Sequence, residues 1–129
     1  MAAPQILLVD DNPTNLQVLY QTLEGQGYRV IAEASGDVAL RNHAAIDAAH
    51  LLFTDVLLPG LKGPGLAREV LRRRPDIKVL YSSGGGLDFA REPTAPGLPL
   101  PPLLAKPYTL LQLARAVRSL LDADCSTVT

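Results

Sequence analysis

The chain has 129 residues, of which 47% are hydrophobic and 19% are charged, and its formal net charge is −1. These values fit one globular domain and give no reason to expect a surface that binds nucleic acid or an acidic membrane. The sequence has one cysteine, Cys125, so it cannot form an intramolecular disulfide. No apolar run approaches the roughly 18 residues of a membrane span, and the first four residues lack the features of a signal peptide. We therefore expect a small, soluble, cytoplasmic domain.

The first predicted strand ends in two adjacent acids. An apolar run over residues 6–9 is followed by Asp10 and Asp11, and then by Asn12 and Pro13, which predict a helix start. The acids should therefore lie at the carboxyl end of a buried strand, where open α/β folds bind ligands. Adjacent carboxylates repel each other unless a cation lies between them or one is protonated, and their hard oxygens favour magnesium. The alternative is one helix cap and one solvated turn acid.

Helices and strands alternate along the rest of the chain. Apolar residues at helical spacing, next to proline, glycine or capping signals, predict helices over residues 13–25, 36–48, 64–74 and 110–121. Short β-prone runs predict strands over residues 28–32, 50–54, 77–81 and 103–105. Five strands that alternate with helices favour a parallel sheet with helices on both faces and right-handed crossovers.

The first and last helices have the clearest apolar faces. The residues expected to face the core are Leu16, Leu19, Tyr20 and Leu23 in the first helix, and Leu110, Leu113, Ala114, Val117, Leu120 and Leu121 in the last. Thr109 and Gln112 form a capping box before the last helix. We interpret the arginines at residues 72–74 as a solvated helix end rather than a nucleic-acid patch. Residues 93–102 include five prolines, so we expect the helix before the fifth strand to be shortened or missing.

Polar side chains stand at the carboxyl ends of four predicted strands. They are Asp10 and Asp11, Asp55, Ser82 and Ser83, and Lys106. Three carboxylates and a lysine suit a divalent cation together with a phosphoryl group, and a carboxylate can itself be the nucleophile. One of the serines would then hydrogen-bond a phosphoryl oxygen. Since no histidine or cysteine lies at these strand ends, Ser-His or Cys-His catalysis is not expected.

An ordered set of motifs links these residues to a known family. The set is V-D-D-N at residues 9–12, Asp55 with Pro59-Gly60 and Gly63 after it, Ser82-Ser83-Gly84, and Lys106-Pro107. It resembles the receiver domain of two-component response regulators, and the strings around Asp10 and over residues 80–84 look most like receivers of hybrid sensor histidine kinases. The resemblance covers residues 5–121. It implies a receiver domain over residues 1–122 and a polar tail over residues 123–129.

The resemblance also implies a fold and a function. The fold is α/β and flavodoxin-like (CheY-like), a doubly wound five-stranded parallel sheet in the order 2-1-3-4-5. The function is that of a phosphoacceptor in a phosphorelay, which takes a phosphoryl group from a histidine kinase or a histidine phosphotransfer domain with Mg2+. Such a domain is a signalling module rather than an enzyme, it does not itself bind nucleic acid or membrane, and it can form a homodimer.

The resemblance gives each pocket residue a role. Asp55 would be the phosphoacceptor, and Asp11 a direct magnesium ligand together with Asp55 and the backbone carbonyl of Leu57. Asp10 would act mainly through magnesium-bound water. Lys106 would pair with the phosphoryl group, and its bond to Pro107 would be cis.

Two serines compete for the role of switch hydroxyl. Ser82 is the better candidate because it stands at the separation from Asp55 that is usual in receivers with this string, and Ser83 then fills the small-residue position beside it. Many receivers couple this hydroxyl to an aromatic residue three positions before the lysine, but here that position is Leu103. We therefore expect no aromatic rotamer switch at that position.

Other departures and alternatives remain. Leu57 and Gly84 occupy positions that often help to orient the hydrolytic water, and neither has a side chain able to do so. One alternative is a receiver-like docking module that works without phosphorylation. Another is a magnesium-dependent phosphohydrolase, but such enzymes carry a second acid two residues after the nucleophile, where this chain has Leu57.

Overall fold

A five-stranded parallel sheet forms the centre of the molecule. The computed structural model describes residues 3–83 and 102–128, with side chains as far as residue 122. The strands are β1 (Gln5–Val9), β2 (Arg29–Glu33), β3 (Leu51–Asp55), β4 (Lys78–Ser83) and β5 (Leu103–Ala105). They pair in the order β2-β1-β3-β4-β5, every pair parallel. The predicted fold class and strand order are therefore confirmed.

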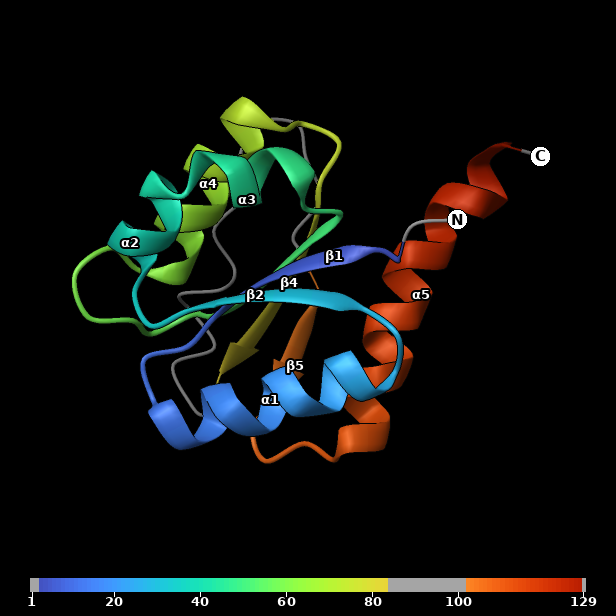
Figure 1. Cartoon of the computed structure of the whole chain (residues 1–129), viewed down its shortest axis with the longest axis horizontal. Helices are drawn as coiled ribbons and strands as arrows, with labels where there is room; N and C mark the ends of the chain where they lie inside the picture. Colours follow the sequence, from blue (N-terminus) through green and yellow to red (C-terminus); the bar gives the residue numbers. More distant parts are fainter. Residues whose placement is uncertain (1–2, 84–101, 129) are drawn as a thin grey trace.

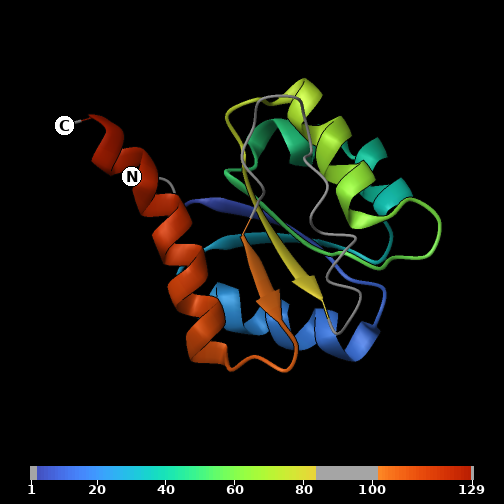
Figure 2. The same cartoon turned by 180° about the vertical axis from the view of Figure 1, so that it is seen from behind.

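Helices cover both faces of the sheet. They are α1 (Pro13–Gly25), α2 (Gly36–Arg41), α3 (His43–Ala48), α4 (Gly63–Arg73) and α5 (Leu110–Val128). Helices α1 and α5 lie against one face, and α2, α3 and α4 lie against the other (Figures 1 and 2). The polypeptide thus forms three layers, and all the parallel strands end at one edge of the middle layer.

The alternation of strand side chains divides the core into two halves. In β1, Ile6 and Leu8 pack on the side of α1 and α5, whereas Leu7 and Val9 pack on the side of α2, α3 and α4. Each of these four side chains is at most 1% exposed. Strands buried on both faces need a continuous apolar run, which is what residues 6–9 supply, and each such side chain contributes about 1.5–3 kcal/mol on burial.

The segment predicted as one helix over residues 36–48 consists of two. Helix α2 ends at Arg41 and α3 begins at His43, because the side chain of Asn42 takes two partners. Its Oδ1 accepts a hydrogen bond from the amide of Ala45 (3.2 Å), and its Nδ2 donates to Glu33 Oε2 (2.9 Å). Hydrogen bonds from an asparagine side chain to the nearby backbone compete with the backbone hydrogen bonds that would continue the helix.

Two residues expected in the core lie on the surface instead. Tyr20 is 36% exposed and Leu110 is 49% exposed, although Leu19, Leu23, Leu113 and Val117 are buried as predicted. The reason is that α1 and α5 each contact the sheet through a stripe of side chains that is narrower than the apolar face predicted for the helix.

The last helix runs further than predicted. Helix α5 continues to Val128, so the backbone of residues 123–128, which the sequence assigned to a polar tail, is helical. The expected shortening of the helix before β5 concerns residues that lie outside the described part of the chain. Among the described residues, no helix combines the length and apolarity needed to cross a bilayer.

Candidate functional site

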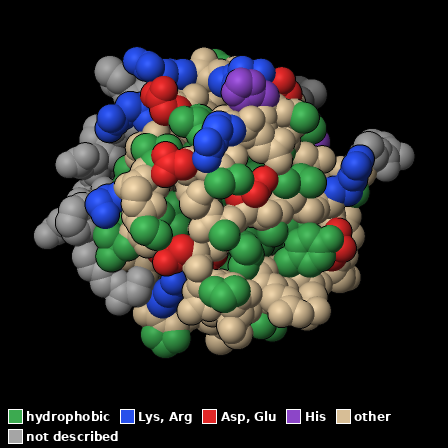
Figure 3. Space-filling model, turned by 60° about the vertical axis from the view of Figure 1, so that its left-hand side comes forward, with side chains coloured by type: hydrophobic (Ala, Val, Ile, Leu, Met, Phe, Trp, Pro, Cys, Tyr) green, Lys and Arg blue, Asp and Glu red, His purple; other side chains and the backbone are tan. Residues whose placement is uncertain are grey.

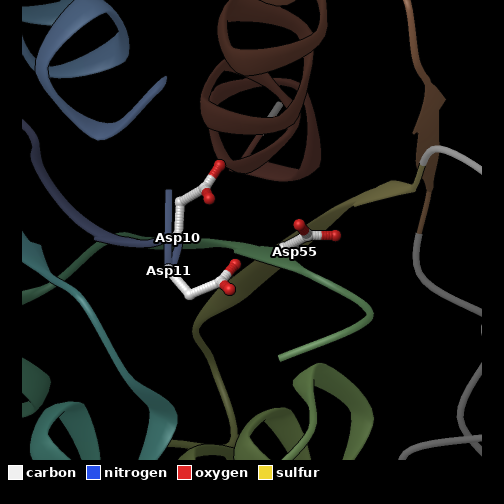
Figure 4. Close-up of side chains that lie close together, drawn as sticks. All are labelled: Asp10, Asp11 and Asp55. Carbon is white, nitrogen blue, oxygen red and sulfur yellow. The ribbon is translucent and has the colours of Figure 1, made fainter. Parts of the chain in front are cut away.

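Three carboxylates meet at the carboxyl ends of β1 and β3. These strands are neighbours, with Val9 opposite Thr54, so the residues that follow or end them lie side by side. One oxygen from each of Asp10, Asp11 and Asp55 lies within 4.8 Å of the others, and Figure 4 shows Asp11 extending toward Asp55. The space-filling view from the side of the strand ends shows acidic side chains among hydrophobic ones (Figure 3). The predicted convergence of these acids is therefore found.

Asp10 has the most restricted environment of the two adjacent acids. Asp10 is 2% exposed, whereas Asp11 is exposed. The Oδ1 of Asp10 accepts a hydrogen bond from the amide of Asn12 (2.9 Å). Burial raises the pKa of Asp10, and the charges of Asp55 and Asp11 add to this, while the Asn12 bond and the charge of Lys106 act in the opposite direction. The cluster is thus an anionic site with one partly compensating cation.

Lys106 supplies that cation. It follows β5, and its Nζ lies 3.0 Å from Asp55 Oδ2, to which it donates a hydrogen bond. The side chains are 28% and 10% exposed, respectively, so the pair is shielded from bulk water more than a surface ion pair is. The peptide bond from Lys106 to Pro107 is cis, as predicted.

The two serines of β4 lie in different surroundings. Ser82 stands opposite Asp55 in the β3–β4 register and is 2% exposed. Since strand side chains alternate, Ser82 lies on the same face as Leu80, which packs on the side of α1 and α5. Ser83 belongs to the opposite face. The register therefore places Ser82, and not Ser83, beside Asp55.

The loop after Asp55 is fixed by close backbone packing. A Cβ on Gly63 would stand 2.3 Å from the backbone oxygen of Asp55, and the Gly63 amide donates to the backbone oxygen of Val56 (3.0 Å). Gly60 has a φ of 71°, a conformation that favours glycine. Leu57, two residues after the end of β3, is 42% exposed.

Tyr108 is a site residue that sequence reasoning missed. Its ring packs edge-to-face on Phe53, with 6.4 Å between the ring centroids, and both residues belong to the core on the side of α1 and α5. Burial raises the pKa of Tyr108 to about 12, and the charges of Asp10 and Asp55 add to the shift. An aromatic residue directly after Lys106-Pro107 was the available signal.

Comparison with known proteins identifies the family. The model of the response regulator receiver domain matches residues 6–118. The chain belongs to this family. The family and the fold that the sequence led us to expect are now confirmed.

Relatives of this receiver domain include kinases and single-domain regulators. The sensor kinase CckA of Brucella abortus (strain 2308) is 33% identical over 121 residues, and the response regulator receiver protein CpdR of the same strain is 30% identical over 122 residues. These alignments cover 91% and 92% of this chain, but 12% of CckA and 98% of CpdR. A response regulator receiver domain protein from Clostridium thermocellum superposes with a TM-score of 0.84 at 28% identity, covering 96% of this chain and 98% of that one.

The acidic cluster of this receiver domain has the composition of a divalent-cation site. It offers one carboxylate oxygen each from Asp10, Asp11 and the buried Asp55, and these three oxygens lie within 4.8 Å of one another. Oxygen ligands of this kind suit Mg2+, and a bound cation would offset the repulsion among the three carboxylates. The residues present therefore fit the metal that receivers use.

Proposed function

We propose that this receiver domain accepts a phosphoryl group from a phosphohistidine onto Asp55, with Mg2+ bound by Asp10, Asp11, Asp55 and the backbone carbonyl of Leu57. The setting of the Asp55 carboxylate supports this most directly. Asp55 is 8% exposed, its Oδ2 lies 3.0 Å from the Lys106 ammonium, and its carboxylate is grouped with two others. A carboxylate in such a setting can act as a nucleophile toward a phosphoryl group whose charge the site neutralises.

The transfer is a displacement at phosphorus. One oxygen of Asp55 attacks as the phosphorus–nitrogen bond breaks, and the donor histidine, protonated at its other ring nitrogen, leaves as neutral imidazole. Lys106 neutralises a phosphoryl oxygen, and Ser82 donates a hydrogen bond to another. Asp10, Asp11 and Asp55 would hold Mg2+, which would supply further positive charge against the phosphoryl group. In this role the domain promotes only its own phosphorylation and dephosphorylation.

The donor is a histidine kinase or a histidine phosphotransfer domain. Relatives of this chain include the sensor kinase CckA, which agrees with a kinase partner.

The second candidate function is docking without phosphorylation. One observation favours it: Leu103 packs in the apolar core on the side of α4, so β5 has no aromatic residue there to respond to a phosphoryl group.

Acetyl phosphate with Mg2+, followed by Phos-tag electrophoresis, separates the two candidates. We expect a shifted band for the wild type and none for Asp55→Asn. Asp122→Asn, at an exposed acid of α5 that pairs only with Arg118 among the described residues, is the matched control and should shift like the wild type. A wild type that neither shifts nor binds beryllofluoride in the presence of Mg2+ would favour the docking module.

A further inference from the structure

The loop between β3 and α4 carries the backbone carbonyl that the proposed metal site uses. Residues 56–62 form this loop, and the Gly63 amide, which donates to the backbone oxygen of Val56 (3.0 Å), closes its base. Leu58 packs in the core on the side of α2, α3 and α4, whereas the Leu57 side chain is 42% exposed. Because the Leu57 side chain is not anchored in the core, the direction of its carbonyl depends on the path of the loop.

The tip of this loop lies against the first turn of α2 (Figure 1). The Leu61 amide donates a hydrogen bond to the carboxylate of Asp37, with 3.4 Å between the nitrogen and Oδ2. A Cβ on Gly60 would stand 2.7 Å from the same oxygen, and a Cβ on Gly36 would stand 2.7 Å from the backbone oxygen of Leu61. The backbones of the loop and of α2 therefore approach each other closely, and the Asp37 carboxylate lies at this contact.

The contact of Asp37 with the loop is separate from the capping of α2. The cap is the side chain of Ser35, whose Oγ accepts a hydrogen bond from the Val38 amide (3.1 Å). Among the ion pairs of the described residues, none involves Asp37. The Asp37 carboxylate thus serves neither as the helix cap nor in one of these ion pairs, and its hydrogen bond goes to the loop.

We propose that Asp37 is a positioning residue for the metal site: its carboxylate holds Gly60 and Leu61 against α2 and thereby keeps the Leu57 carbonyl in place for Mg2+. The inference rests on the proposed function, because it needs that carbonyl as a metal ligand. Asp37 does not belong to the cluster of three acids, so it acts through the loop rather than as a ligand.

Titration calorimetry with magnesium chloride on the whole chain tests this role by comparing Asp37→Ala with Asp37→Asn. Both variants remove the charge of Asp37, but asparagine keeps a side-chain oxygen that can accept from the Leu61 amide. We expect Asp37→Ala to bind Mg2+ about two- to ten-fold more weakly than Asp37→Asn, the effect of one hydrogen bond. Asp37→Asn should bind within about two-fold of the wild type, because the charge of this exposed residue is screened by solvent and salt.

Ser35→Ala is the matched control. It removes the hydrogen bond that caps α2 and leaves the Asp37 carboxylate on the loop. It should lower the midpoint of urea unfolding and change the affinity for Mg2+ by less than about two-fold. As a second readout, without Mg2+, hydrogen exchange of the Leu61 amide should be faster in Asp37→Ala than in the wild type and in Asp37→Asn.

The outcomes separate this inference from the proposed function. If the wild type does not bind Mg2+, both are wrong. If the wild type binds Mg2+ but Asp37→Ala and Asp37→Asn have equal affinities, Asp37 does not position the loop, and the inference alone is overturned. Equal weakening by Ser35→Ala and Asp37→Ala, or unchanged exchange of the Leu61 amide in Asp37→Ala, would overturn it in the same way.

Discussion

At the scale of single residues, Gly63 connects backbone packing with the chemistry of the pocket. Its position against the Asp55 carbonyl leaves no space for a side chain, since a Cβ would stand 2.3 Å from that oxygen and 3.0 Å from the Cα of Val56. Both neighbours are backbone atoms, which cannot rotate away. The close approach therefore fixes the end of β3, where the phosphoacceptor lies.

Gly63→Ala should move or strain the end of β3. We expect a loss of about 1–3 kcal/mol in the free energy of unfolding and slower labelling of Asp55 by acetyl phosphate. Urea unfolding and Phos-tag time courses measure the two effects. Gly25→Ala is the control, because nothing lies within 4 Å of its Cβ position, and it should be neutral or slightly stabilising. Equal behaviour of the two variants would contradict this account of Gly63.

Leu57 should govern how long the aspartyl phosphate survives. It lies two residues after Asp55, is 42% exposed and has no polar side-chain group to orient a water molecule. Leu57→Asn should therefore speed loss of the phosphoryl group by up to about ten-fold, the effect of one hydrogen bond from the amide to the attacking water. Decay of the phosphorylated band after removal of acetyl phosphate measures this. Leu111→Asn, at an exposed leucine of α5, is a control that should leave the rate unchanged.

At the scale of elements, strand β4 contains a buried hydroxyl group that lowers the stability of the fold. Among the residues that the structure describes, the Tyr81 hydroxyl is the buried side-chain polar atom without a hydrogen-bond partner. Burial raises the pKa of Tyr81 above its ordinary value. An unpartnered buried hydroxyl costs about 1–3 kcal/mol, although the ring itself contributes to the core on the side of α4.

Tyr81→Phe should therefore stabilise the protein by about 1 kcal/mol at neutral pH. The wild type should also lose stability as the pH rises above 10, because Tyr81 then releases its proton in the unfolded state and keeps it in the folded state. The free energy of unfolding should fall by about 1.4 kcal/mol per pH unit for this one group. Tyr81→Phe should weaken this dependence. Urea unfolding at neutral pH and at several pH values above 10 measures both effects, with Tyr20→Phe as the exposed control. A destabilised Tyr81→Phe variant would show that the hydroxyl has a stabilising partner.

Helices α2 and α3 show how a contact between elements changes a local pattern. The residues from Ser35 onward read as one helix, and both halves are helical. The break lies at Asn42, whose side chain reaches Glu33 at the end of β2. The sequence of the helical segment alone does not predict that bond, because the partner, Glu33, belongs to β2.

At the scale of the whole molecule, the acidic cluster should couple metal binding to stability. We expect excess Mg2+ to bind the folded state, where strands β1 and β3 bring the acids together. Binding should raise the free energy of unfolding by about 2.7 kcal/mol at 100 times the dissociation constant. Asp11→Asn should be more stable than the wild type in EDTA, because one repelling charge is gone, and should gain little from Mg2+. Urea unfolding in EDTA and in excess Mg2+ tests this, with Asp122→Asn as control. A wild type that Mg2+ does not stabilise would contradict the metal site.

The sequence by itself determined the order of elements and the identity of the pocket. Apolar runs, caps and prolines act over a few residues, and in a parallel sheet every strand ends at the same edge, so Asp10, Asp11, Asp55, Ser82 and Lys106 could be grouped before any coordinates. The capping box of Thr109 and Gln112 was equally local, and both of its hydrogen bonds are present.

Only the tertiary structure decided how side chains and backbone meet across the layers. The packing of Gly63 on the Asp55 carbonyl, the contact of the Tyr108 ring with Phe53 and the exposure of Leu110 all depend on how separate elements pack together. Such contacts depend on the distance between packed elements and on the direction of each side chain, and spacing along a sequence specifies neither of these.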